Sequence, residues 1–302
     1  MESNFKLHTH SRLIRHVEGS VFNQSKHLFQ LGALSAQFSR DGYTVCEETL
    51  DLARCLVRET FLTDISPCDV WAGLQQGLLE KRPSTFIVFL RDCGALKICL
   101  PEINTLFNTP QSATFHPEGD VGTHTLLVLD KAADLSSAIN VRFAALLHDI
   151  GKGLTPSSDL PRHIGHERRG LELLPEINRR LGNIPSDCYD LVNVVIKNHL
   201  LMHRLEELKP RTVLRLLEAV RAVPGSPMSE DFILTCQADS QGKGNSERPY
   251  PPADLIRRYS KALGQLRHEN AAIDQTSDKS EHFRQQQFQA IATVKQAWGA
   301  KR

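Results

Sequence analysis

The sequence predicts an all-α protein. Apolar residues recur at intervals of three and four along nearly the whole chain, and no stretch shows a convincing strand-type alternation or an alternation of strands with helices. Proline, glycine and capping residues bound the apolar stretches, as they do at helix ends. With 302 residues, 40% of them hydrophobic, the chain can bury a sizeable core.

The N-terminal part reads as a series of short helices. Asp69, which follows Pro67, is one of the residues that mark their starts. The predicted helices cover residues 25–38, 47–59, 69–79 and 84–90. The stretch "FNTPQSATFHPEGDVG" (107–122) holds two prolines and two glycines, which indicates a boundary.

Longer helices are predicted after this boundary. They cover residues 120–135, 137–149, 166–181, 187–203, 209–222 and 229–240. A loop, "SQGKGNSERPYPP", then leads to predicted helices at 253–267 and 280–298. We therefore expect a helical segment over residues 1–110, a second domain over 111–245 and a helical tail over 246–302.

Composition excludes several classes of protein. Thirty-six Lys and Arg residues against thirty-five Asp and Glu residues leave a net charge of +1, so any nucleic-acid-binding surface must be local. No window approaches about 18 apolar residues and the N-terminus lacks a secretory signal, so we expect a soluble cytoplasmic protein without a membrane segment. The seven cysteines are scattered and never form C-x-x-C, which argues against a disulfide framework and a thiolate zinc site.

Histidine and aspartate residues at predicted helix ends are the candidates for chemistry. The apolar run in "FAALLHDIGKG" ends on His148 and Asp149, and the glycines at 151 and 153 allow the backbone to approach a ligand closely. Asp239 ends "DFILTCQAD" and is followed by glycines at 242 and 244. Together with His124, these side chains offer nitrogen and oxygen ligands for a divalent cation. A His-Asp pair alone is equally compatible with an exposed surface pair.

Further residues near this set have more than one interpretation. His166 and His199 could bind a second cation, with Asp149 between the two ions, or could contact phosphate. Asp149 and Lys152 are the candidate catalytic residues, and the candidate phosphate-binding residues are Lys152, Arg162 and Arg168. Lys152 could instead face solvent at a helix C-terminus. His163 and His203 are expected to be polar lining or surface residues.

The order of these motifs resembles a known superfamily. His124 is followed after 24 residues by His148-Asp149, then by "HIGH" (163–166), "NHLLMH" (198–203) and the aspartate of "QAD". This order resembles the HD superfamily of metal-dependent phosphohydrolases. The stretch "RFAALLHDIGKGLTP…PRHIGHERRG" is similar to the HD domain at the C-terminal end of bacterial CCA-adding tRNA nucleotidyltransferases, and the similarity covers roughly residues 12–265.

The resemblance implies a multi-helix HD-domain fold preceded by a helical segment, with the same four metal ligands. It does not extend to nucleotide addition. No part of the chain resembles the nucleotidyltransferase domain of that family. Where the family has the charged nucleotide-pocket motifs Glu-Asp-Pro-Leu-Arg and Glu-Arg-Val-Trp-Lys-Glu, this chain reads "NQSKH" (23–27) and "CDVWAG" (68–73). Because arginine and carboxylate groups read a base through directed hydrogen bonds, we expect no nucleotidyl transfer.

Two functional hypotheses follow from the resemblance. The first is a stand-alone HD phosphohydrolase that acts on nucleotides or RNA 3′ ends, with 2′,3′-cyclic phosphates and 2′-phosphates as substrates. The second is a tRNA-binding helical module that works with a separate nucleotidyltransferase. The cofactor of the first would be a divalent metal ion, and the ligand types do not distinguish Ni, Mn, Co, Mg, Fe or Zn. The sequence leaves the oligomeric state open.

Overall fold

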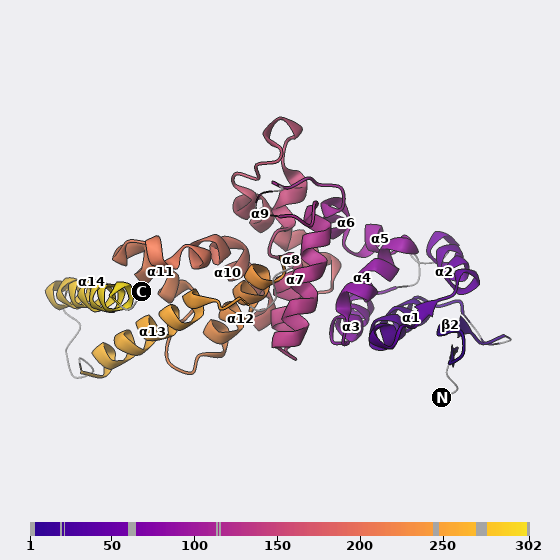
Figure 1. The fold of residues 1–302 in the computed structure, drawn as a ribbon, viewed down its shortest axis with the longest axis horizontal. Helices are drawn as coiled ribbons and strands as arrows, with labels where there is room; N and C mark the ends of the chain where they lie inside the picture. The colour runs from indigo at the N-terminus through magenta and orange to yellow at the C-terminus, as the bar shows by residue number, and fades with distance from the viewer. Residues whose placement is uncertain are drawn as a thin grey trace.

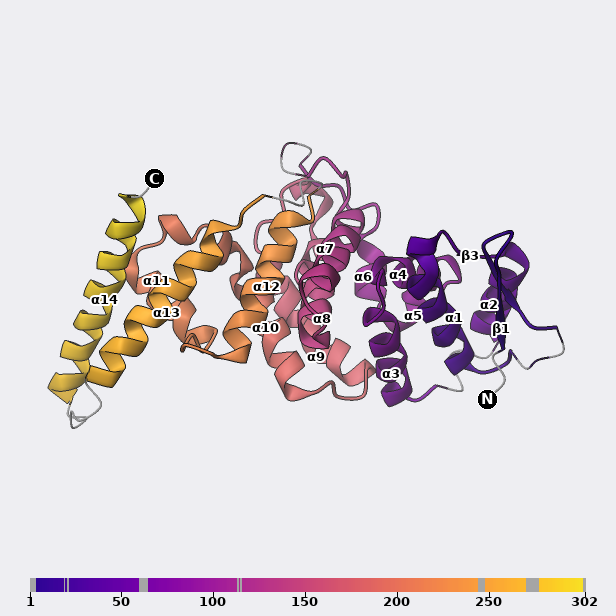
Figure 2. The same ribbon diagram turned by 60° about the horizontal axis from the view of Figure 1, so that its bottom comes forward.

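The computed structural model describes residues 4–18, 20, 22–59, 65–112, 114, 116–243, 248–269 and 277–300. Gly244, one of the glycines predicted to matter after Asp239, lies outside these residues. Figure 1 shows an elongated body in which the helices follow one another along the long axis, roughly in chain order. Figure 2 shows the same order after rotation.

A small sheet that the sequence did not predict lies at the N-terminal end. Strands β1 (Phe5–His8) and β2 (Leu13–His16) are antiparallel, and β3 (Thr44–Val45) pairs with β2 in parallel. Strands of four, four and two residues are too short to display a period of two, which explains why sequence periodicity did not reveal them. Apart from this sheet the described chain is helical, as predicted.

The N-terminal helices form the first part of the body. Their bounds are α1 Ser25–Phe38, η1 Ser39–Asp41, α2 Glu47–Glu59, α3 Pro67–Leu78, α4 Pro83–Asp92, α5 Leu96–Cys99 and α6 Pro101–Leu106. Helix α1 packs against α3 and α4. Gln24, Lys26 and Asp69 line a pocket of about 580 Å³ beside these helices, at the position of the altered family motifs.

The central part carries the predicted ligands. Its elements are α7 Val121–Leu135, α8 Ile139–Leu147, η2 Ile150–Leu154, η3 Ser157–Asp159, α9 His166–Arg180, α10 Ser186–His203, η4 Leu205–Glu207 and α12 Pro227–Gln241. Helix α8 is buried at every residue from Val141 to Leu147 and packs against α7, α10 and α12. A helix enclosed on all sides in this way delivers the residues at its end into the interior.

The C-terminal part consists of α11 (Pro210–Ala219), α13 (Pro251–Glu269) and α14 (Ser277–Gly299). Helix α14 packs against α11 and α13 at the far end of the body (Figure 1). No described helix combines the length and the apolarity that crossing a membrane requires. One cluster of buried apolar residues extends from Phe5 to Ile291 and connects all three parts.

Each predicted helix is present, and the ends differ by a few residues. The largest functional difference is at α8, which ends at Leu147 rather than at residue 149. His148 caps this helix, and Asp149 directly precedes the tight turn of η2. The short helices α5 and α6 were not predicted, since four and six residues carry little periodicity.

Candidate metal centre

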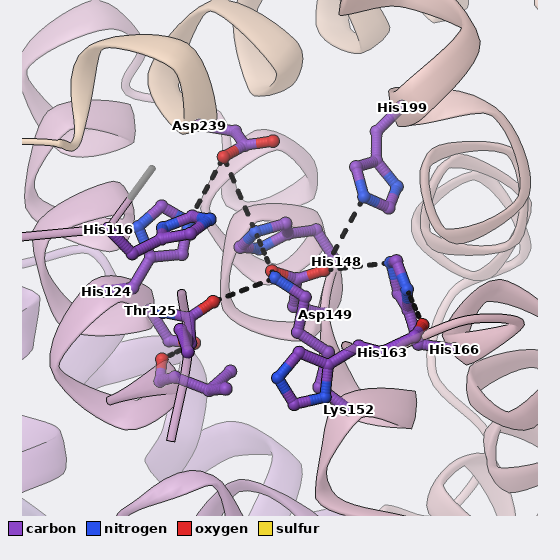
Figure 3. A network of polar contacts seen from close by, with 12 residues as sticks. His116, His124, Thr125, His148, Asp149, Lys152, His163, His166, His199 and Asp239 are labelled. Atoms are coloured by element: carbon purple, nitrogen blue, oxygen red, sulfur yellow. Dashed lines mark hydrogen bonds and ion pairs between the residues drawn. The ribbon is translucent and has the colours of Figure 1, made fainter. Parts of the chain in front are cut away.

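Six buried side chains from different elements meet in the middle of the molecule (Figure 3). They are His124 in the first turn of α7, His148 after α8, Asp149 before η2, His166 at the start of α9, His199 in α10 and Asp239 in α12. Residues up to 115 positions apart in the chain are thus brought into contact.

The four side chains predicted as ligands surround one point. His124 Nε2 lies 3.1 Å from Asp239 Oδ1. His148 Nε2 lies 3.1 Å from Asp149 Oδ2 and 3.8 Å from Asp239 Oδ1. Ligands that each sit about 2.0–2.2 Å from one ion are themselves about 3–4 Å apart, so these spacings fit a single cation.

Asp149 connects this point to a second one. Its other oxygen, Oδ1, lies 3.2 Å from His166 Nε2 and 3.5 Å from His199 Nε2. The ligand atoms of Asp149, His166 and His199 all lie within 4.8 Å of one another. The carboxylate of Asp149 therefore faces two clusters of imidazole nitrogens, one through each oxygen.

The imidazole rings are held with the same nitrogen directed inward. The Nδ1 atoms of His148, His166 and His199 lie 2.8, 2.8 and 3.0 Å from the backbone carbonyl oxygens of Ala145, His163 and Val195. Because a carbonyl oxygen can only accept a hydrogen bond, each Nδ1 carries a proton, so the Nε2 of each ring in its neutral form presents a lone pair to the cluster. This is the arrangement that outer contacts impose on metal-binding histidines.

Three of the inward-facing atoms lack hydrogen bonds. Among the described residues, the buried atoms without a hydrogen-bond partner include His148 Nε2, Asp149 Oδ1 and His166 Nε2. Imidazole nitrogens and carboxylate oxygens thus lie close together with atoms left unsatisfied, which is unfavourable in a buried site. A divalent cation between them would satisfy both, so the donor set fits such an ion.

The two carboxylates are ionised in this environment. Burial alone would raise the pKa of the Asp149 carboxyl, but Lys152 and His148 hold that pKa well below its usual range. Burial likewise opposes ionisation of Asp239, and His203 and His148 hold its pKa well below the usual range. Burial also lowers the pKa of His199, which keeps that imidazole neutral and able to bind a metal.

Close backbone packing sets the position of η2. A Cβ on Gly151 would lie 1.9 Å from the carbonyl oxygen of His166 and 2.5 Å from the amide nitrogen of Gly170. Only glycine allows η2 to lie this close to α9. Arg169 stabilises the contact between η2 and α9, because its side chain donates hydrogen bonds to the carbonyl oxygen of Gly151 and to Thr155 Oγ1. The glycine after the His-Asp pair thereby places Asp149 within reach of His166.

The comparisons with known proteins agree with this architecture. Residues 121–240 match the family model described as "HD domain". The chain is 38% identical over 292 residues to the multifunctional CCA protein of Thioalkalivibrio sulfidiphilus, a match that covers 96% of this chain and 71% of that protein. The chain belongs to the multifunctional CCA protein family.

Other CCA proteins match over a smaller share of their length. That of Methylobacillus flagellatus is 41% identical over 243 residues, which is 80% of this chain and 58% of that protein. That of Pseudomonas fluorescens strain SBW25 is 40% identical over 257 residues, covering 85% of this chain and 63% of that protein. The chain thus spans about three fifths of these two CCA proteins, so their full activities do not transfer to it directly.

The predicted cationic residues separate into two groups within this CCA-family chain. Lys152 is buried and does not face solvent: its Nζ lies 2.6 Å from Asp149 Oδ2 and donates to Gln111 Oε1 at 2.9 Å. Arg162 and Arg168 are exposed, and Arg168 pairs with Glu172 on the same helix. The structure brings Lys152 to the cluster and leaves both arginines outside it, so phosphate binding by the arginines stays a prediction.

The residues that surround the ligands were not predicted from the sequence. Glu118 Oε1 lies 2.8 Å from His124 Nδ1 and 2.9 Å from His116 Nδ1. Burial opposes ionisation of Glu118, but its contact with His124 lowers the carboxyl pKa to about 2. The ionised carboxylate orients His124 with Nε2 inward. The pattern "HPEGD" (116–120), which lies in the predicted boundary loop, was the feature of the sequence that could have indicated His116 and Glu118. His203, expected as lining or surface, contacts Asp239 directly.

Proposed function

We propose that this chain is a metal-dependent phosphohydrolase that acts on nucleotide or RNA-terminal phosphates, as a 2′,3′-cyclic phosphodiesterase, 2′-nucleotidase or phosphatase. The observation that carries the proposal is the buried cluster of imidazole nitrogens and carboxylate oxygens, in which His148 Nε2, Asp149 Oδ1 and His166 Nε2 have no hydrogen-bond partner. The HD domain match and the CCA-protein relatives support it, since all six ligand positions lie within the matched residues.

His124, His148, Asp149 and Asp239 would hold the first divalent ion through one oxygen or nitrogen atom each. His166 and His199, together with Asp149 Oδ1, would hold a second ion. A divalent ion at such a site supplies Lewis-acid chemistry, because it lowers the pKa of bound water toward neutrality and attracts a phosphoryl oxygen. The mixture of imidazole and carboxylate ligands does not select one metal among Mg, Mn, Fe, Co, Ni and Zn.

The protein's own groups complete the site. Lys152 brings a positive charge beside the ligands, and its contact with Gln111 fixes the direction of the ammonium group. With Asp149 bound to a cation, the Lys152 ammonium, held by Gln111, would be available to a phosphate oxygen of the substrate. A buried ammonium group acts there with little screening by water and stabilises the charge that develops in the transition state.

The experiment compares the full chain with two variants, His148→Ala and Asp149→Ala, on 2′,3′-cyclic AMP with added Mn²⁺ or Ni²⁺. Both variants should lose turnover and bound metal together. His282→Ala is the matched control, because His282 is an exposed histidine on α14. Metal-dependent turnover that is the same in all four proteins would end the proposal. Absent hydrolysis with retained tRNA in a gel shift would favour the tRNA-binding module instead.

A further inference from the structure

Asp239 uses its two oxygens differently. Oδ1 faces His124 and His148 in the cluster, whereas Oδ2 lies 2.6 Å from His203 Nε2, on the outer side. A heavy-atom separation of this size is short for a hydrogen bond between nitrogen and an ionised oxygen, which marks a strong contact. One oxygen is therefore available to a cation and the other is occupied by the protein.

His203 presents a proton where the other histidines present a lone pair. Its Nδ1 lies 3.0 Å from the hydroxyl oxygen of Tyr250. A tyrosine hydroxyl can donate, unlike the carbonyl oxygens that hold Nδ1 of His148, His166 and His199. Donation from Tyr250 to Nδ1 leaves the proton of neutral His203 on Nε2, where it is donated to Asp239. This tautomer makes His203 a partner of the ligand and not a ligand itself.

The segment that carries Tyr250 is anchored next to Asp239. Gln241, two residues after Asp239 on α12, donates from Nε2 to the carbonyl oxygen of Arg248 at 2.7 Å. Tyr250 directly precedes α13, which starts at Pro251. His203 is the last residue of α10, one turn after His199. The hydroxyl, the imidazole and the carboxylate thus come from three separate segments and form one chain of hydrogen bonds.

We propose that His203 and Tyr250 are positioning residues that hold Asp239 as a one-oxygen ligand. This inference rests on the metal centre of the proposed function. With Oδ2 bound to His203, the carboxylate cannot chelate the cation through both oxygens, so a coordination position stays open for water or substrate. Without His203, Asp239 is free to rotate and to bind through both oxygens or neither.

The test is titration of the full chain with Co²⁺, following both the affinity by calorimetry and the visible absorption spectrum, which reports the coordination geometry. His203→Leu should weaken Co²⁺ binding by about 10- to 100-fold and change the spectrum. His203→Gln keeps an N–H donor and should recover most of the affinity and the original spectrum. Tyr250→Phe should alter the spectrum with a smaller loss of affinity.

Tyr259→Phe is the matched control. Tyr259 is a buried tyrosine on α13 whose hydroxyl has no hydrogen-bond partner among the described residues, so its removal should leave Co²⁺ binding unchanged. Wild-type affinity and spectrum in His203→Leu would overturn the inference while leaving the metal centre intact. If that variant does not fold, an unchanged spectrum in Tyr250→Phe overturns it equally. Failure of the wild-type chain to bind Co²⁺ would instead reject the proposed metal centre and this inference with it.

Discussion

Replacing Gly151 by alanine tests how η2 positions the cluster. The new Cβ would lie 1.9 Å from the carbonyl oxygen of His166, whereas real Cβ atoms essentially never come within 3.0 Å of another atom. The two backbones would have to separate by more than about 1 Å, and the clashing atoms cannot rotate away because both belong to the main chain. Overpacking of a core costs typically about 1–3 kcal/mol, and we expect the upper end here.

The same displacement should disturb His166. A working metal site needs its ligands within about 0.2 Å of their ideal distances, so a shift of this size removes His166 from its place beside Asp149. We therefore expect Gly151→Ala to lose binding at the His166–His199 cluster while it retains an ion at His124, His148 and Asp239. Urea unfolding measures the stability, and calorimetry with Mn²⁺ measures the number of ions bound.

Two other glycines supply graded controls. A Cβ on Gly153 would meet Thr105 Oγ1 at 2.4 Å, and because that is a side-chain atom it can turn aside at a smaller cost. A Cβ on Gly299 would meet nothing within 4 Å, so Gly299→Ala should stay within about 0.5 kcal/mol of wild type. Equal urea midpoints for Gly151→Ala and Gly299→Ala would refute the close packing of η2 on α9.

Three further predictions concern other parts of the chain. Arg142→Ala should cost about 3 kcal/mol or more in urea unfolding, because the buried guanidinium donates to backbone carbonyls of four residues. Arg40→Ala, which breaks an exposed ion pair, should cost at most about 1 kcal/mol, and similar values for the two variants would contradict the assignment. Glu118→Gln should weaken Mn²⁺ binding about 10- to 100-fold in calorimetry, and unchanged affinity would show that Glu118 does not orient His124. A thiol reagent at pH 8 should modify exposed Cys68 before Cys99. Burial raises the pKa of Cys99 to about 12, so Cys99 is a protonated, unreactive thiol at pH 8. Early labelling of Cys99 would contradict its burial.

The metal ligands could be recognised from the sequence, but the residues that orient them could not. His148 and Asp149 could be recognised because they end an apolar helix and precede glycines, which are local features. The direct partners of Asp239 lie 115 and 36 residues away in the chain, and Tyr250 contacts His203 across 47 residues. Such contacts depend on how α7, α10 and α12 pack against one another, and the hydrophobic periodicity of the sequence does not predict this packing.

The burial of Lys152 also depends on a contact with a residue distant in the chain, so it could not be predicted from the sequence. Its position after a helix end is typical of a cation that faces solvent, which was one of the two interpretations. Its burial depends on Gln111, 41 residues earlier, and on the turn of η2 that directs the side chain back to Asp149. The small N-terminal sheet escaped prediction for a different reason, because its strands are too short for a pattern to emerge.

The most direct test of the central claim is anomalous diffraction from crystals of the full chain soaked in Mn²⁺. We expect an anomalous peak about 2.0–2.2 Å from His124 Nε2, His148 Nε2, Asp149 Oδ2 and Asp239 Oδ1. No peak among these four atoms at saturating Mn²⁺, or a peak only between His116 and Glu118, would contradict the claim that they form a metal centre.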